Sequence, residues 1–221
     1  MKTNSPLHNC CSYAVNLSIM KQFIVVIGYS AGGLEALTKF FDATPCDGVS
    51  YIVLNHVPSD TVSYLKTILN RHSKLEVIEL FDVIPVANNK VYLVPPGNYL
   101  VMKDRALQIV PRSGYDNTVN CSIDIFLESV AKETSYSTIA IFLSGFGNDG
   151  AKGASLIKEA GGMILVQEPD SCFASNIPNE VMKATTVDGI YLPEDMPVAI
   201  QKIVAMGADA SQDKRHTSLQ G

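Results

Sequence analysis

Residues 23–33 read FIVVIGYSAGG, and the expected architecture of the chain follows from this stretch. The apolar residues 23–27 predict a buried strand, the glycine-rich residues 28–33 a tight turn, and residues 34–41 a helix. On such a turn the hydroxyl of Ser30 stands clear of the sheet, and amides at the helix start can face a developing negative charge. This is how a serine nucleophile is presented. The same glycines also suit a turn that only lets a strand pack closely on its helix.

The rest of the chain alternates between buried-type strands and amphipathic helices. The predicted strands are 51–54, 75–80, 91–94, 138–143, 163–166 and 189–192, with a hairpin of 99–103 and 106–110 turned at 104–105. The predicted helices are 61–71, one that starts at 122, 151–160, 179–183, and one from 194 to about 206. This order predicts an α/β fold: a doubly wound, mostly parallel sheet with helices on both faces and an antiparallel hairpin addition.

Length and composition favour one globular domain. We expect it to cover residues 22–206, after a loosely ordered leader at 1–21 and before a disordered tail at 207–221. With 47% hydrophobic and 18% charged residues, the chain is typical of soluble globular proteins. Its longest apolar runs, such as 139–143, are far shorter than the ~18 residues that span a bilayer, so no membrane insertion is expected. The net charge of −5 argues against a nucleic-acid partner.

The cysteines favour a reducing compartment. There are five, an odd number, and none has the C-x-x-C spacing of a zinc site. They are Cys10, Cys11, Cys46, Cys121 and Cys172. Free thiols, together with polar residues that interrupt any signal-peptide core near the start, predict a cytoplasmic protein with no metal site.

Three polar loops are expected at one edge of the predicted sheet. They carry Ser30, His56 and Asp149, each after a buried strand. In an open parallel sheet, ligands gather at the carboxyl ends of the strands. A hydroxyl, an imidazole and a carboxylate at that edge are the groups of a serine-hydrolase triad.

The candidate histidine of this site is chosen by elimination. The chain has four, of which His8 and His216 lie in the predicted tails and His72 ends a helix on a solvated face. Only His56 follows a buried strand at the same edge as Ser30. A histidine there could simply cap a strand end, but beside Ser30 it is the natural general base, because its unperturbed pKa lies close to physiological pH.

Asp149 has two readings of equal weight from the residues alone. It stands in a glycine-rich loop directly before a helix, where an aspartate N-cap is common and where a catalytic orienter would also stand. The chain order serine, histidine, aspartate differs from that of α/β-hydrolases, chymotrypsin-like and subtilisin-like enzymes. A triad in this chain therefore belongs to another fold.

A set of motifs along the chain resembles the catalytic domain of CheB-type protein-glutamate methylesterases. In order they are IGYSAGG at 27–33, NHVP at 55–58, VYLVPPG at 91–97, LSGFGNDG at 143–150 and VQE at 166–168. The resemblance runs from about residue 22 to 205, and the set is far more specific than any one motif. The stretch SIDIF at 122–126 looks most like versions fused to chemoreceptor methyltransferases.

The resemblance implies a role for each site residue. Ser30 is the nucleophile, His56 the base and Asp149 its orienter, in hydrolysis of glutamyl methyl esters with release of methanol and no cofactor. Backbone amides of Ala31 and Phe146 are the oxyanion donors. The substrate-side loop is Gly32, Gly33 and Asn148.

The family also implies partners, and the chain departs from its pattern. The implied substrate is a methylated chemoreceptor or a similar helical protein, and deamidation of its glutamines is a further implied activity. A receiver domain usually precedes this domain in the family, whereas here residues 1–21 precede the first strand, so we expect a stand-alone domain with a separate regulatory protein. Position 31 is alanine where threonine is frequent. Residues 117–121 lack the basic and histidine residues common there, which leaves the receptor open.

Other readings remain at this stage. A catalytically idle binding or regulatory module of the same fold would explain the altered 117–121 segment but gives no reason to retain Ser30, His56 and Asp149. A nucleotide-binding domain is disfavoured because residues 28–33 lack the G-x-G-x-x-G spacing and no acidic residue ends the second strand. A general esterase for small esters would use the same residues.

Overall fold

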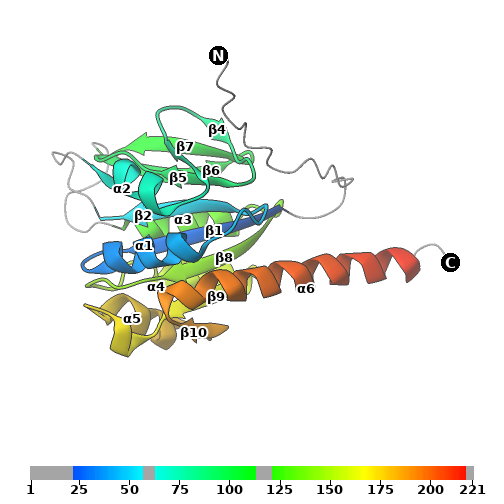
Figure 1. The fold of residues 1–221 in the computed structure, drawn as a ribbon. Helices are drawn as coiled ribbons and strands as arrows, with labels where there is room; N and C mark the ends of the chain where they lie inside the picture. Colours follow the sequence, from blue (N-terminus) through cyan, green and yellow to red (C-terminus); the bar gives the residue numbers. More distant parts are fainter. Residues whose placement is uncertain (1–21, 57–62, 113–120, 218–221) are drawn as a thin grey trace, which may run out of the picture.

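The structure, a computed structural model, describes residues 22–56, 63–112 and 121–217. The expected leader at 1–21 therefore lies outside the described residues. The described part is built around a seven-stranded sheet with the order β10-β9-β8-β1-β2-β5-β3 (Figure 1), and every neighbouring pair is parallel. Its strands are β1 (Gln22–Tyr29), β2 (Ser50–Asn55), β3 (Glu76–Glu79), β5 (Lys90–Leu93), β8 (Tyr136–Phe142), β9 (Met163–Gln167) and β10 (Gly189–Tyr191).

Helices cover both faces of the sheet. The helices are α1 (Gly33–Ala43), α2 (Leu65–His72), α3 (Ser122–Ala131), α4 (Ala151–Glu159), α5 (Asn176–Ala184) and α6 (Met196–Thr217), with 3-10 turns η2 (Pro169–Ser171) and η3 (Pro193–Asp195). Alternate residues of β1 point to opposite faces. Val25 and Ile27 pack with α1, α2 and α6, whereas Ile24 and Val26 pack with α3, α4 and α5. The doubly wound prediction is confirmed.

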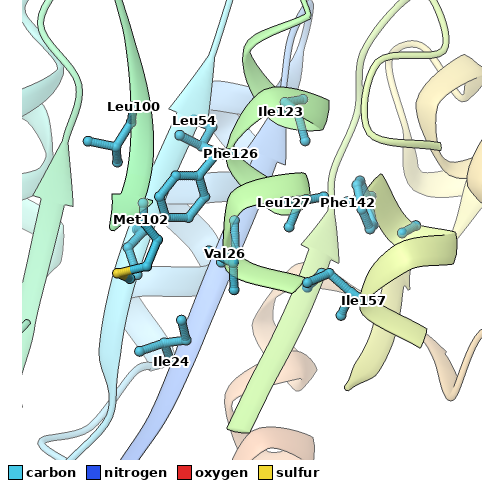
Figure 2. Close-up of a cluster of buried hydrophobic side chains, with 14 of the residues drawn as sticks. Ile24, Val26, Leu54, Leu100, Met102, Ile123, Phe126, Leu127, Phe142 and Ile157 are labelled. Carbon is cyan, nitrogen blue, oxygen red and sulfur yellow. The ribbon is translucent and has the colours of Figure 1, made fainter. Parts of the chain in front are cut away.

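The antiparallel addition is a small sheet of its own. The predicted hairpin is β6 (Asn98–Lys103) and β7 (Ala106–Pro111), and β4 (Ile84–Pro85) joins it in the order β4-β7-β6. Positive φ angles of 51° at Asp104 and 65° at Arg105 make the two-residue turn that suits a twisted hairpin. Leu100 and Met102 of β6 lie in the same apolar cluster as Phe126 and Leu127 of α3 (Figure 2), so the addition covers α3 and the sheet beneath it.

The last helix is longer than predicted. The sequence predicts its end near Met206, whereas α6 continues to Thr217. Its first turns bury Met196 and Ile200 against the α1 side of the sheet. Packing therefore anchors the start of this helix, and the helix extends past that anchor into polar sequence.

The strand order creates a topological switch point at β1. From β1 the chain builds outward through β2, β3 and β5, then returns to place β8 on the other side of β1. The loops that follow β1 and β8 diverge from this switch point, where open α/β sheets bind ligands. We call this edge, where the parallel strands end, the carboxyl edge, and the opposite one the amino edge.

Candidate active site

Ser30 and His56 follow neighbouring strands at the carboxyl edge. In the register of β1 with β2, Tyr29 lies opposite Asn55, so Ser30 and His56 are the residues directly after the ends of the two strands. Neighbouring strands lie about 4.8 Å apart. Tyr29 and Asn55 are themselves joined, because the Asn55 side-chain amide donates to the Tyr29 hydroxyl at 3.0 Å. Burial raises the pKa of Tyr29 to about 12, so this hydroxyl stays neutral near pH 7.

The turn that carries Ser30 is fixed by backbone contacts. The Ser30 N–H donates to the Ser144 carbonyl at 3.0 Å, and the Gly33 N–H donates back to the Ser30 carbonyl at 3.0 Å. Gly145 lies so close that a Cβ there would be 2.8 Å from the Ser30 Cβ. The nucleophile candidate is thus held between β2 on one side and the loop after β8 on the other.

Ser144 and Gln167 organise this loop from beneath. Both are buried, with Ser144 at 0% and Gln167 at 3% exposure. The Gln167 side-chain oxygen accepts the Ser144 N–H at 2.9 Å, and the Ser144 hydroxyl donates to the Ala31 carbonyl at 2.8 Å. Both residues lie in the sequence motifs 143–150 and 166–168, but no role was predicted for either. A polar residue directly after the buried strand 163–166 was the available signal for Gln167.

His56 and Asp149 form a close pair. The Asp149 Oδ2 lies 2.6 Å from the His56 Nε2, with side-chain exposures of 19% for His56 and 5% for Asp149. A carboxylate only accepts hydrogen bonds, so Nε2 carries the proton of the neutral ring and Nδ1 is left as the acceptor. The imidazole is therefore oriented with one nitrogen committed and the other available as a base.

Asp149 caps a helix other than the one that directly follows it. The helix that follows it, α4, has Gly150 as its N-cap with no side-chain cap bond. The Asp149 carboxylate instead accepts the amides of Ile123 at 3.0 Å and Asp124 at 2.9 Å, in the first turn of α3. Of the two readings that the sequence left open for Asp149, an N-cap on its own helix is therefore contradicted. The partial positive charge of the α3 N-terminus favours a negative group at this position.

The other predicted site residues fall into two groups. Gly32, Phe146 and Asn148 are exposed and Ala31 is half-buried, all on the loops that flank Ser30. Gly33 is buried, and a Cβ there would lie 2.6 Å from the Tyr29 ring and 2.8 Å from the Ser144 carbonyl. Gly33 therefore serves close packing of α1 on the sheet. Gly32 adopts φ +75°, a left-handed conformation that glycine accommodates at a helix N-cap.

An exposed aromatic pair stands beside the Ser30 turn. Phe146 is 59% and Phe173 76% exposed, and their rings meet edge to face with centroids 6.4 Å apart. Phe173 lies directly against the turn, since a Cβ at Gly32 would be 2.2 Å from the Phe173 Cβ. Phe173 was not predicted at this site, because no local sequence pattern connects it with Ser30.

The nearby thiols are weak nucleophiles. Cys121 and Cys172 are free and half-buried. Burial raises the pKa of Cys121, to which the charges of Asp149 and Asp124 add, and burial raises the pKa of Cys172 to about 11. Both thiols are thus protonated near neutral pH, when the thiolate is the reactive form.

The described residues contain neither a cluster of metal ligands nor a membrane-spanning helix. Among the residues that the structure describes, no group of three or more histidine, cysteine, aspartate or glutamate side chains could hold a metal ion. Within 22–56, 63–112 and 121–217, no helix is both long and apolar enough to cross a membrane.

A small cleft opens beside Asn55, lined also by Leu54, Val94, Pro95, Pro96, Asn98, Leu100, Arg112 and Ser122.

Comparison with known proteins shows the family to which the chain belongs. The model of the CheB methylesterase family matches residues 25–200. The chain belongs to the CheB methylesterase family. The crystal structure of the Thermotoga maritima CheB methylesterase catalytic domain is similar, with a TM-score of 0.74 and 28% identity over 82% of this chain and 98% of that one. The resemblance found in the sequence is confirmed, as is the α/β fold.

Curated relatives of CheB type share the same segment. A protein-glutamate methylesterase/protein-glutamine glutaminase of Saccharophagus degradans is 34% identical over 174 residues, which cover 78% of this chain and 47% of that protein. A second, of Myxococcus xanthus, is 31% identical over 165 residues, or 73% of this chain and 47% of that protein. The chain thus spans about half the length of these relatives.

Proposed function

We propose that this CheB-family chain hydrolyses glutamyl methyl esters on a protein substrate, with Ser30, His56 and Asp149 as its catalytic triad. The observation that carries the proposal is the 2.6 Å pair of His56 and Asp149 at the end of the strand next to Ser30. The curated relatives carry the names protein-glutamate methylesterase and protein-glutamine glutaminase, which supports the same reaction for this chain.

The first half of the reaction forms an acyl-enzyme. His56 Nδ1 takes the proton of the Ser30 hydroxyl as its oxygen attacks the side-chain ester carbonyl. The tetrahedral oxyanion accepts hydrogen bonds from the amides of Ala31 and Phe146, each such donor commonly contributing ~3 kcal/mol. As the intermediate collapses, the imidazolium gives its proton to the leaving methoxide, and methanol departs.

The second half restores the enzyme. A water molecule gives a proton to His56 Nδ1 and attacks the acyl carbonyl, and collapse returns that proton to the Ser30 oxygen. The product is the glutamate carboxylate. Throughout, Asp149 accepts the Nε2–H, holds the ring in one tautomer and stabilises the imidazolium without taking the proton. Glutamine deamidation follows the same course, with ammonia as the leaving group.

The proposed substrate is a methylated chemoreceptor or a similar helical protein. Its ester must reach Ser30 past Phe146 and Phe173, whose exposed rings offer an apolar contact for a protein surface. The proposed working compartment is the cytoplasm. A separate regulatory protein is a further partner in this proposal.

The test is methanol release from methylated chemoreceptor membranes by the full chain and by Ser30→Ala. We expect release by the wild type and a loss of at least ~10³-fold in the variant, because the variant lacks the nucleophilic oxygen. Circular dichroism checks that both are folded. A small activated ester, p-nitrophenyl acetate, serves as a second substrate.

Each outcome separates the alternatives. Release by the wild type alone supports the reaction and the nucleophile. Equal release by both proteins overturns the triad assignment. Folded wild type that cleaves neither substrate favours the idle binding module, whereas cleavage of p-nitrophenyl acetate alone points to a different natural ester or a missing regulatory partner.

A further inference from the structure

In the Ser122-Ile123-Asp124 motif, the Asp124 side chain is a half-buried acid that the proposed mechanism leaves unused. Asp124 lies in the first turn of α3, and its Oδ1 accepts the Gly153 N–H at 2.7 Å. Gly153 lies in the first turn of α4, the helix that Asp149 directly precedes. The Asp124 side chain therefore caps α4 from outside that helix.

The two helices thus exchange their caps. Asp149, at the start of α4, accepts the Asp124 N–H at 2.9 Å and the Ile123 N–H at 3.0 Å in α3. Asp124, at the start of α3, accepts the Gly153 N–H in α4. Each carboxylate meets the amides of the other helix, so the two helix starts and the two acids form a closed ring of hydrogen bonds. Two of the Asp149 bonds in this ring fix the same carboxylate that accepts from His56.

The first turns of α3 and α4 pack so closely that only glycine fits at two positions between them. A Cβ at Gly153 would lie 2.6 Å from the Leu127 Cβ and 3.1 Å from the Asp124 Oδ1. A Cβ at Gly150, which has φ +99°, would lie 2.9 Å from the Ile123 side chain. Glycine at both positions lets the first turns of α3 and α4 approach closely enough for each acid to reach the other helix.

We infer that Asp124 is a positioning residue of the hydrolytic site, which fixes the Asp149 carboxylate against His56 through this reciprocal cap. The inference rests on the proposed function and extends it to a residue that touches neither substrate nor the reacting atoms. Asp124 acts by tying the start of α4 to the start of α3. Without that bond, only the Asp149 bonds to the amides of Ile123 and Asp124 join the two helix starts.

The charges around Asp124 support the same view. Burial raises the pKa of Asp124, and the neighbouring charge of Asp149 raises it further. The amides of Gly153 and Gly150 and the charge of Lys152 act in the opposite direction. A second carboxylate this close to Asp149 has an electrostatic cost, and the two helix N-termini offset it.

The test compares Asp124→Ala with a matched acid elsewhere, Asp188→Ala, in the full chain. The Asp188 carboxylate also accepts a backbone amide, from Ile164 at 2.8 Å, but at the amino edge of the sheet. We expect Asp124→Ala to lower kcat for p-nitrophenyl acetate about 10- to 100-fold with KM little changed, since displaced catalytic groups cost rates of this order. Asp188→Ala is expected to keep the kcat of the wild type.

Two readouts distinguish positioning from general destabilisation. The first is the downfield proton resonance of the His56 Nε2–H, which reports its bond to Asp149 directly; we expect it in the wild type and in Asp188→Ala, and its loss in Asp124→Ala. The second is a double variant. In an Asp149→Asn background, Asp124→Ala is expected to lower kcat less than twofold further, because Asp124 acts only through Asp149.

The outcomes decide the inference separately from the proposed function. An Asp124→Ala variant with wild-type kcat and an intact His56 resonance overturns the inference, as does an equal loss of both in Asp188→Ala. If the wild type cleaves no ester, the proposed function fails, and the His56 resonance alone decides whether Asp124 positions the pair. Should Asp124→Ala not fold, Asp124→Leu takes its place under the same criteria, because leucine is similar in size and accepts no hydrogen bond from Gly153.

Discussion

Asp149 and Asp188 are two acids at opposite edges of the same sheet, and each accepts backbone amides. At the carboxyl edge, Asp149 accepts two amides of α3 and pairs with His56 at 2.6 Å. At the amino edge, Asp188 accepts the Ile164 N–H at 2.8 Å and pairs with Lys158 at 2.6 Å. Each acid thus joins a backbone amide to a basic side chain.

The difference lies in the basic partner and its neighbours. Lys158 is a flexible ammonium with three donors, whereas the His56 ring has a second nitrogen that can accept a proton. That ring also follows the strand next to the one that Ser30 follows. A carboxylate fixed by backbone amides is therefore a structural element by itself, and in the proposed mechanism it serves catalysis because the group it orients is a base beside a nucleophile.

The largest expected effect tests this distinction directly. Asp149→Asn cannot satisfy both the α3 amides and the His56 Nε2–H with a single oxygen, and its NH₂ favours the ring tautomer protonated at Nδ1. That tautomer cannot accept the Ser30 proton, so kcat for ester hydrolysis is expected to fall about 10³- to 10⁴-fold. Asp188→Asn is expected to keep the wild-type kcat.

Urea unfolding of the same two variants supplies the control. Both are expected to lose about 1–3 kcal/mol of unfolding free energy, since each weakens charge-assisted hydrogen bonds of a buried or half-buried acid. Stability would then match while activity differs. A comparable loss of kcat in Asp188→Asn contradicts the separation of the two edges.

Crowded glycines offer a second comparison between the edges. A Cβ at Gly145, at the carboxyl edge, would lie 2.4 Å from the Ile177 Cδ1 and 2.8 Å from the Ser30 Cβ. A Cβ at Gly162, at the amino edge, would lie 2.5 Å from the Ile157 Cγ2 and 2.8 Å from the Thr138 carbonyl. We expect Gly145→Ala to displace Ser30 and lower kcat about 100-fold, and Gly162→Ala to leave kcat unchanged.

Thermal unfolding shows whether the two alanines strain the fold equally. Overpacking of this kind costs about 1–3 kcal/mol, so both variants are expected to unfold at lower temperature than the wild type. Activity is then measured well below either transition. If Gly145→Ala is destabilised but fully active, Ser30 does not depend on its contact with Gly145.

The sequence predicted the parts of the site that follow from local pattern. A buried strand followed by a polar turn identifies Ser30 and His56, because parallel strands bring their carboxyl ends to one edge. Cross-capping lies beyond such reasoning: Asp149 and the α3 amides that it caps are separated by 25 and 26 positions, so nothing near Asp149 in the chain marks the partner. The local rule for N-caps could therefore only offer the helix that follows Asp149, as one of two open readings.

Elements with little intrinsic preference were missed for a related reason. Strand β4 consists of Ile84 and Pro85 only, and it exists through its pairing with β7. The longer strands and the hairpin were predicted within a few residues of their bounds, because alternation and turn residues specify them locally. Packing between distant segments determined what remained: the short strand, the exchanged caps and the contact of Phe173 with the Ser30 turn.

The smallest expected effect concerns the surface of the carboxyl edge rather than its chemistry. Phe173→Ala removes the ring that lies against the Ser30 turn, and we expect it to raise KM for methylated receptor about 3- to 10-fold, the loss of one exposed apolar contact. Phe81, 78% exposed after β3 and three strands from β1, is the matched control. Phe81→Ala is expected to leave both constants unchanged, and neither variant is expected to alter hydrolysis of p-nitrophenyl acetate, which is too small to span the aromatic pair. If Phe81→Ala raises KM for the receptor as much as Phe173→Ala, the protein substrate covers the whole edge, and nearness to Ser30 does not define the contact.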